Sequence, residues 1–248
     1  MDRVIYVGMT AAKHTMSQLA SVAQNLSNIQ TVAYKADVHV FKAIPASGPG
    51  NPTREYVVNA KVGTDFSPGS IEHTGNPTDL AIVGPGWFTV KMPDGSEAYT
   101  RNGNFKISPD GVVQTTNGLS VIGVDGGPVT LPLHTDITFG RDGTITSVPA
   151  GNQPSGVTVL GKIKLVNPPD DQIVKGADNF IRLKNGQNAS ADPSVHLMSG
   201  SLESSNVNAI EAMINMIDLG RQFDMQMKLL QTADANASKA SVLLNING

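Results

Sequence analysis

AIEAMINMIDLGRQFDMQMKLLQTADANASKASVLLN, the stretch Ala209–Asn245, carries the repeat that decides the fold of this chain. Two series of mostly apolar residues recur in it at every seventh position. They are Met216, Phe223, Leu230, Ala237 and Leu244, with Ala212, Leu219, Gln226, Ala233 and Ala240 as the companion series. A seven-residue repeat with two such series is typical of a helix that packs along a second helix.

Signals at the start of the stretch support one long helix. Asn208, with Glu211 three residues later, is a variant of the capping box that begins helices. Gly220 is the only glycine in the stretch, and no proline interrupts it. The helix would be roughly 55 Å long at 1.5 Å per residue. That length exceeds the usual globular helix and favours a coiled coil or a helix bundle.

The N-terminal segment shows the same rhythm over fewer heptads. Its two series are Met9, Met16 and Ala23, with Ile5, Ala12, Leu19 and Leu26. This spacing predicts a helix with an a/d seam, although one amphipathic helix packed on its own domain explains so short a repeat equally well. Because both ends of the chain carry the repeat, we expect the two helices to pair in one discontinuous domain.

Between the helices the pattern changes to short strands and tight turns. Asp-Gly or Asn-Gly pairs, which mark hairpin turns, recur between alternating apolar residues. The pairs begin at Asp94, Asn102, Asp110, Asn117, Asp125, Asp142 and Asn185. Strands at this spacing predict an all-β sandwich or barrel. The Pro/Gly-rich run IPASGPGNPT, residues 44–53, predicts a loop before this region.

These patterns predict an α+β chain with three parts. Paired N- and C-terminal helices, within residues 1–33 and 207–248, form a discontinuous coiled-coil domain. An extended connector domain comprises residues 34–75 and 190–206. A central all-β domain spans residues 76–189.

Composition excludes several classes of function. A net charge of −3 and a pI of about 5.9 argue against a partner held through phosphate contacts, so we expect no nucleic acid. The chain has no cysteine, which removes thiolate nucleophiles and thiolate metal ligands. Its five histidines lack the spacing of a metal site, and no nucleophile or phosphate-loop motif is present. We therefore expect no enzymatic activity, no cofactor and no metal.

The N-terminal region does not predict a membrane segment or a secretory signal. Its uncharged run, residues 14–34, is about as long as a membrane span, but it contains too many Gln, Asn and hydroxyl side chains for lipid. The opening MDRVIYVGMTAAKH lacks a basic region followed by an apolar one. We expect neither membrane insertion nor a cleaved signal peptide.

Both terminal helices carry few charges for elements that would face water. The exposed side of a two-helix hairpin normally carries Lys and Glu, whereas these segments carry Ser, Thr, Gln and Asn. In NLSNIQTVAYK, residues 25–35, no charge precedes Lys35. Such side chains can hydrogen-bond across a packed interface without burying an unpaired charge. We expect the helices to be surrounded by copies of the chain or by homologues.

Methionine is concentrated in the same two segments. Six of the nine methionines lie there. They are Met9, Met16, Met213, Met216, Met225 and Met227. Ordinary core filling explains their spacing, whereas an adaptable surface that packs against non-identical neighbours explains them together with the low charge.

Three long motifs, in order along the chain, resemble those of the bacterial flagellar basal-body rod protein family. MDRVIY with NLSNIQTVAYK is similar to its N-terminal signature. NPTDLAIVGPGWFTV and AYTRNGNFKISPDG are similar to the paired motif at the start of its β domain. SGSLESSNVNAIEAMINMIDLGRQFDMQMK is similar to its C-terminal helix signature. The resemblance covers nearly the whole chain, and MDRVIY and RQFDMQMK favour the proximal rod proteins over distal rod or hook relatives.

The resemblance implies a structural subunit of the proximal rod. It implies that the paired helices line a tube around the export channel and that the rod transmits torque across the periplasm. It implies other rod subunits, self and homologous, as partners, and passage through the flagellar export apparatus without a cleaved signal peptide. The family usually has glycine where this chain has Ala33, and this departure puts a left-handed turn at Ala33 in doubt.

A set of helix residues is expected to form the assembly interface. The set is Met9, Met16, Leu19, Asn25, Leu26, Asn28, Met216, Leu219, Phe223, Met227 and Leu230. The apolar members would be buried against neighbouring subunits, and Asn25 and Asn28 would hydrogen-bond to them.

The residue patterns alone leave two other functions open. A β-rich binding or adhesin module on a helical stalk explains the hairpins, but it does not require uncharged helices at both ends. A hydrolase would need a site assembled from scattered Asp and His, with Asp79 and Arg101 as the residues to test. Both lie in the paired motif, where turns or strand pairs are the simpler role for them.

Overall fold

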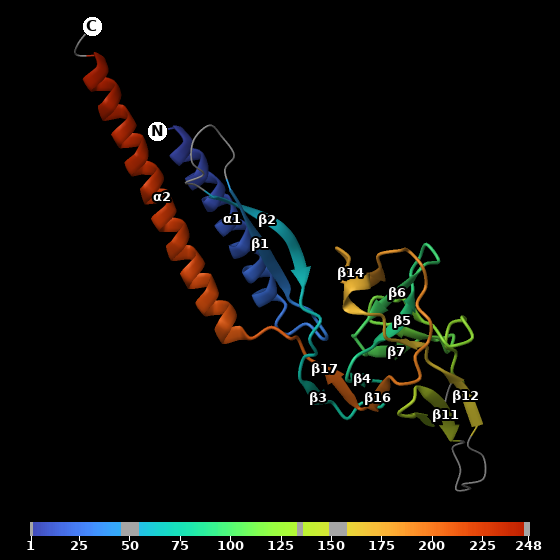
Figure 1. The fold of residues 1–248 in the computed structure, drawn as a ribbon. Helices are drawn as coiled ribbons and strands as arrows, with labels where there is room; N and C mark the ends of the chain where they lie inside the picture. The colour runs from blue at the N-terminus through green and yellow to red at the C-terminus, as the bar shows by residue number, and fades with distance from the viewer. Residues whose placement is uncertain (1, 46–54, 133–135, 149–157, 246–248) are drawn as a thin grey trace. The chain divides into compact units, whose positions relative to one another are not determined.

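The computed structural model describes residues 2–45, 55–132, 136–148 and 158–245, and it divides into two compact units (Figure 1). The helical unit consists of Met1–Asn28, Ala36–Asp65 and Val207–Gly248. The β unit consists of Ile29–Lys35 and Phe66–Asn206. The chain is therefore α+β, as predicted. A separate connector domain stays a prediction, since the compact units group residues 36–65 with the helices and residues 66–75 and 190–206 with the strands.

The helical unit is built on two antiparallel helices. Helix α1 covers Asp2–Ser27, and helix α2 covers Ala209–Asn245, the range predicted from the repeat. The helices pack along each other, and α2 runs past the N-terminal end of α1 (Figure 1). Asn208 caps α2, since its Oδ1 accepts hydrogen bonds from the amides of Ile210 and Glu211 at 3.0 and 3.3 Å. The knobs-into-holes packing of a coiled coil stays a prediction.

A two-stranded antiparallel ribbon completes this unit. Strand β1, Asp37–Pro45, pairs with β2, Glu55–Thr64, and the ribbon packs against α1. Residues 44 and 45 of the predicted Pro/Gly-rich loop end β1, and residues 46–53 lie outside the described part of the chain.

The heptad series occupy different faces of the helices. Ala212 is buried, and the other C-terminal seam positions with described side chains are half-buried. In α1, Ala12 is buried and its companions Ile5, Leu19 and Leu26 are half-buried. The second N-terminal series, Met9, Met16 and Ala23, is exposed instead, so the prediction that it belongs to the seam was wrong. A short repeat indicates two stripes but not which one faces the partner helix.

One polar pair lies inside the helix pair. The Nε2 of Gln226 donates to the Thr15 hydroxyl at 3.1 Å, and that hydroxyl donates to the Ala11 carbonyl. The Oε1 of Gln226 is buried without a hydrogen-bond partner among the residues described. Because an apolar residue would avoid that cost, the pair contributes more to the register of the two helices than to their stability.

The β unit consists of small antiparallel sheets. Its strands are β3 Ile71–His73, β4 Leu80–Val83, β5 Trp87–Lys91, β6 Glu97–Thr100, β7 Phe105–Ile107, β8 Val113–Thr115, β9 Ser120–Val121, β10 Asp136–Phe139, β11 Thr144–Val148, β12 Thr158–Lys162, β13 Leu165–Val166, β14 Ile173–Lys175, β15 Ile181–Leu183, β16 His196–Ser199 and β17 Ser201–Glu203. A short 3-10 helix, Asp170–Gln172, precedes β14. The largest sheet has the order β14-β15-β6-β5-β9-β8-β7, with β13 also paired to β5. Smaller sheets pair β10-β11-β12, β16-β4 and β17-β3.

Strand β5 is the centre of the core. Its first four residues, Trp87 to Val90, are all buried, Thr89 included, so both faces of this strand are covered. Phe88 packs edge-to-face on Phe105 with ring centroids 5.1 Å apart. Ile145 on β11 and Ile163, which directly follows β12, join the same core, so the three-stranded sheet shares one apolar centre with β5.

Most of the predicted turns are present. The glycines of six Asp-Gly or Asn-Gly pairs have positive φ. They are Gly95, Gly111, Gly118, Gly126, Gly143 and Gly186. The seventh pair, Asn102-Gly103, forms no hairpin turn, so that prediction was wrong. Gly103 lies instead against the Leu80 backbone, where a Cβ would be 1.7 Å from the Leu80 carbonyl oxygen.

Candidate functional site

Helix α2 carries a second apolar stripe on the side opposite the seam. Ile210, Met213, Ile214 and Ile217 are spaced i, i+3, i+4 and i+7 and are all exposed, Ile210 by 72%. Met225 continues the stripe. We call these five residues the outer face of α2. A helix that is apolar on two opposite sides is suited to burial between neighbours rather than to a water-facing surface.

Helix α1 has a comparable stripe. Tyr6, Met9 and Met16 are more than half exposed, and the small residues Ala20 and Ala23 continue the same side of the helix. Lys13 is the charged residue in this stripe, residues 6–23. The helical unit therefore presents two apolar stripes, one on each helix. Arg221 lies in the α2 stripe between Ile217 and Met225, and seven of the 37 residues of α2 are Asp, Glu, Lys or Arg, so low charge is a property of α1 and not of α2.

The residues expected at the assembly interface fall into three groups. Met9, Met16 and Met227 are exposed. The larger seam residues are half-buried within the helical unit and so are already in use there. These are Leu19, Leu26, Met216, Leu219, Phe223 and Leu230. Their contact with neighbouring subunits stays a prediction.

The third group is the pair of asparagines, which have hydrogen bonds inside the helical unit. The Asn25 side chain pairs with the backbone of Asp37, donating to its carbonyl and accepting from its amide, both at 2.9 Å. The Nδ2 of Asn28 donates to the Gln24 carbonyl at 2.9 Å. These contacts explain the polar helix end: Asn25 joins α1 to the start of β1, and Asn28 satisfies a carbonyl of the last turn.

The exposed isoleucines were missed from sequence. The signal was available, because Ile210, Ile214 and Ile217 have helical spacing off the two heptad series. The two heptad series account for only one apolar side of α2, and the remaining apolar residues form the opposite side.

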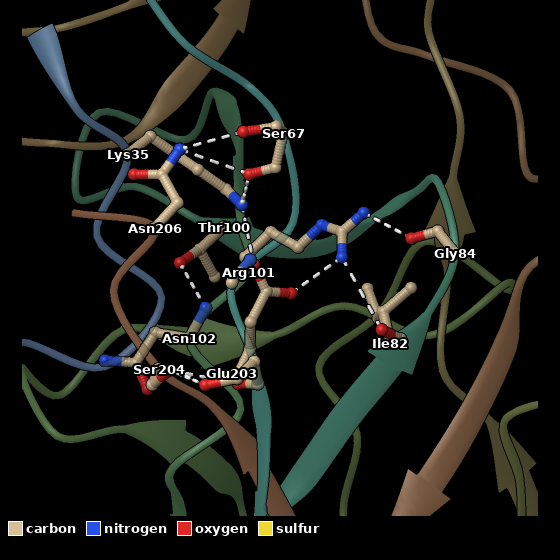
Figure 2. Close-up of polar contacts among 12 residues, drawn as sticks. Lys35, Ser67, Ile82, Gly84, Thr100, Arg101, Asn102, Glu203, Ser204 and Asn206 are labelled. Atoms are coloured by element: carbon tan, nitrogen blue, oxygen red, sulfur yellow. Dashed lines mark hydrogen bonds and ion pairs between the residues drawn. The ribbon is translucent and has the colours of Figure 1, made fainter. Parts of the chain in front are cut away.

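A buried charged cluster lies in the β unit. The Glu203 carboxylate, 1% exposed, accepts from Lys35 Nζ at 2.6 Å and from Arg101 Nη1 at 2.7 Å (Figure 2). Lys35 and Arg101 are themselves 3% and 4% exposed. One carboxylate thus faces two cations away from water, an arrangement that is stable only with well-formed hydrogen bonds. Nothing in the spacing of residues 35, 101 and 203 along the chain predicts that they meet.

Arg101 has further partners on β4, on β5 and on the turn between them. Its guanidinium donates to the carbonyls of Gly84 and Ile82 and lies over the Trp87 ring, 5.5 Å from the ring centroid. Its Nε has no hydrogen-bond partner among the described residues.

Asp79, the other residue proposed for a hydrolase, also holds backbone segments together. Its Oδ2 accepts from the Thr74 hydroxyl at 2.7 Å, and its carbonyl accepts from the Gly200 amide at 2.8 Å. Within residues 2–45, 55–132, 136–148 and 158–245, no three His, Asp or Glu side chains gather so as to hold a metal ion. Neither α1 nor α2, over the residues described, is both long and apolar enough to cross a membrane.

Ala33 does adopt the left-handed conformation that the sequence put in doubt. Its φ is 57°, and its amide donates to the Glu203 carbonyl at 2.8 Å. The expectation failed because this hydrogen bond and the burial of the neighbouring Tyr34 and Lys35 hold the backbone there.

Replacing Ala33 by glycine is expected to stabilise the β unit. The left-handed region costs a non-glycine residue roughly 1–2 kcal/mol, and the greater freedom of glycine in the unfolded chain offsets about 0.4–1 kcal/mol of that gain. We expect Ala33→Gly to raise the free energy of unfolding by about 0.5–1 kcal/mol. Urea unfolding followed by fluorescence of Trp87, the single tryptophan, measures it.

The matched control for this change is Ala191→Gly. Ala191 is exposed and has no positive φ, so its replacement should lower the free energy of unfolding. Equal destabilisation by the two changes would show that Ala33 carries no conformational strain.

Comparisons with known proteins add a second line of observation. A family model described as "Flagellar hook protein FlgE/F/G D1 domain" matches residues 81–147. Another, "Flagellar basal body rod FlgEFG protein C-terminal", matches residues 198–243. The matched segments contain β5, most of the large sheet and nearly all of α2.

Full-length relatives resemble the chain from end to end. It is 39% identical over 253 aligned positions to flagellar basal-body rod protein FlgF of Salmonella typhimurium, with all of both chains covered. The FlgF protein of Escherichia coli gives the same identity and coverage. Flagellar basal-body rod protein FlgG of Bacillus subtilis is 28% identical, with 94% of this chain and 96% of that protein covered.

Proposed function

Because this chain belongs to the flagellar basal-body rod protein family and is most like its FlgF members, we propose that it builds the proximal part of the rod and transmits torque there. As a member of that family it is a structural subunit of the flagellar basal body. The finer role rests on the surfaces of the helical unit.

The observation that carries the proposal is the exposure of the outer face of α2 and of the α1 stripe. Each buried square ångström of apolar surface contributes about 25 cal/mol, so several half-exposed isoleucines and methionines per subunit would stabilise side-by-side packing. The proposed occupants are copies of this chain or homologous rod subunits, because the C-terminal family model extends over residues 198–243 and so over nearly all of α2. Long helices packed in this way resist twisting, which is the property that a drive shaft needs.

The same proposal places the helices around the export channel. Paired as a coiled coil, α1 and α2 would line an inner tube, and the β unit would face outward. We further propose that the subunit passes through the flagellar export apparatus without a cleaved signal peptide and assembles where the rod crosses the periplasm. The exposed apolar residues of both helices support assembly as the last step, because they remain available for packing in the free chain.

Thiol labelling tests the packing directly, since the chain has no cysteine of its own. Met213→Cys, on the outer face of α2, should react with a maleimide in the free chain. In isolated basal bodies its reaction should be at least about tenfold slower, because a packed interface core excludes reagent.

The control for this labelling is Val159→Cys on β12, at a residue 65% exposed in the β unit. It should react at similar rates in the free chain and in basal bodies if the β unit faces outward. Equal reactivity of Met213→Cys in both states would contradict the proposed packing.

A further inference from the structure

The chain passes between its two units at three points, and all three lie close in sequence to the buried charged cluster. The crossings fall at residues 35 and 36, at residues 65 and 66, and at residues 206 and 207. Lys35 is the last β-unit residue before the first crossing. Gly69 follows the second crossing by a few residues, and Glu203 precedes the third by as few.

We call the β-unit segments next to the crossings, residues 33–35, 66–70 and 203–206, the first, second and third connections. Glu203, in the third connection, binds the first and the second. Its Oε1 accepts from Lys35 Nζ at 2.6 Å and from the Gly69 amide at 3.1 Å. Its backbone carbonyl accepts from the Ala33 amide at 2.8 Å. Lys35 Nζ also donates to the Ser67 carbonyl at 2.7 Å, so the first and second connections are joined to each other as well (Figure 2).

The residues just beyond Glu203 extend these links. The Asn206 amide donates to the Tyr34 carbonyl at 3.2 Å, and Asn206 Nδ2 donates to the Ser67 carbonyl at 3.2 Å. The hydroxyls of Ser204 and Ser70 lie 2.7 Å apart, and the Ser204 amide donates to the Ser70 carbonyl at 2.8 Å. Each of the three connections therefore bonds to both of the others.

Arg101 connects Glu203 and the three connections to the largest sheet. It follows β6 directly, and it joins the Glu203 carboxylate to the carbonyl of Gly84, on the turn between β4 and β5. Burying three charges is a poor way to gain stability, since apolar residues of similar size do as well or better. Charged groups with fixed hydrogen-bond geometry instead add specificity, because they hold particular backbone segments in one arrangement.

We propose that Glu203 is a clamp that fastens all three connections to the β unit as one body. When the clamp is intact, force on any connection is shared by the other two and by β6. When it is lost, the connections come free while the sheets stay folded. The clamp rests on these contacts alone, and its use in carrying torque rests in addition on the proposed function.

Amide hydrogen exchange of the purified full-length chain tests the clamp. Glu203→Gln keeps the shape of the side chain but removes its charge and replaces one acceptor by a donor that faces the cations. We expect amides in residues 33–35, 67–70 and 203–206 to exchange at least about tenfold faster, with those of β5 and β6 unchanged. Glu97→Gln, which breaks the pair of Glu97 with Lys164 in the same unit, should leave all three connections unchanged.

A second variant covers the case in which Glu203→Gln does not fold. Lys35→Met keeps the Arg101–Glu203 pair and removes the contacts of Lys35 Nζ with Glu203 and with the Ser67 carbonyl. It should speed exchange at residues 33–35 and 67–69 and leave β5 and β6 as they were. Uniformly faster exchange over the whole β unit in the folded variant, or no change at the connections, overturns the clamp.

The mechanical role has its own readout. Cells carrying a clamp variant should contain normal amounts of the subunit in isolated basal bodies but swim more slowly in viscous medium than cells with Glu97→Gln. Normal swimming together with opened connections overturns the load-sharing role. Loss of the outer-face contacts, by contrast, is detected as missing subunit in the basal body, so failure of the clamp and failure of the proposed function are distinguishable.

Discussion

Gly103→Ala is expected to destabilise the β unit severely. A Cβ at this position would be 1.7 Å from the Leu80 carbonyl oxygen and 2.7 Å from the Leu80 carbonyl carbon, and both are backbone atoms. Leu80 cannot retreat, because its side chain is fully buried in the main core and its amide bonds to the Gly103 carbonyl at 3.0 Å. We expect a loss of more than about 4 kcal/mol in the free energy of unfolding, the range reserved for severe packing defects.

Urea unfolding of the purified chain, followed by Trp87 fluorescence, measures this loss. Trp87 is buried in the β unit, so its signal reports that unit rather than the helices. Gly161→Ala on β12 is the matched control, because a Cβ there meets nothing within 4 Å and its φ is not positive. The control should change the free energy of unfolding by less than about 1 kcal/mol. A Gly103→Ala protein with the parent unfolding midpoint would show that the Leu80 contact is not tight in solution.

Ile214→Glu combined with Ile217→Glu should abolish swimming and leave the free chain folded. Both isoleucines are more than half exposed on the outer face of α2, so their loss removes little from the isolated subunit, within about 0.5 kcal/mol per site. In the assembled rod they would be buried, and full burial of one isoleucine side chain contributes about 1.5–3 kcal/mol. Two carboxylates in that place would have to be desolvated, and only the one introduced at residue 217 has a cation, Arg221, four residues on. Desolvating the other without a partner costs more than the lost burial.

The size of the swimming zone in soft agar and the amount of subunit in isolated basal bodies measure this effect. Gln222→Glu, at an exposed polar residue of the same helix, adds one carboxylate outside the apolar stripe and should leave a normal zone. Circular dichroism of the free chain confirms that the double variant retains its helices. A normal zone for the double variant would exclude the outer face as an assembly surface.

Elements specified by nearby residues were predictable. Helix α2 begins and ends where its heptads and Asn208 placed it, because a capping side chain and a helical period act over a few residues. Turns such as Asp94-Gly95 and Asp142-Gly143 followed from glycine at a left-handed position. The family was likewise readable from three long motifs.

Contacts between distant segments were not predictable. Asn102-Gly103 matches the sequence pattern of a hairpin turn, but the close contact of Gly103 with the Leu80 backbone decides its conformation. Met9 and Met16 share a heptad with the seam, yet only the position of α2 shows which stripe of α1 is covered. Ala33 is held in a left-handed conformation by a partner that lies far along the chain, the Glu203 carbonyl.

The sequence by itself determined the two helices, the hairpins and the kinship with rod proteins, since each depends on periodicity, local turn chemistry or a continuous motif. The tertiary structure alone decided which charges are buried. Lys35, Arg101 and Glu203 are ordinary surface residue types in the sequence. Only the fold brings Lys35 Nζ and Arg101 Nη1 within 2.7 Å of the Glu203 carboxylate oxygens. Ion pairing has no period and no fixed separation along a chain, because it requires only that the folded backbone bring the groups together.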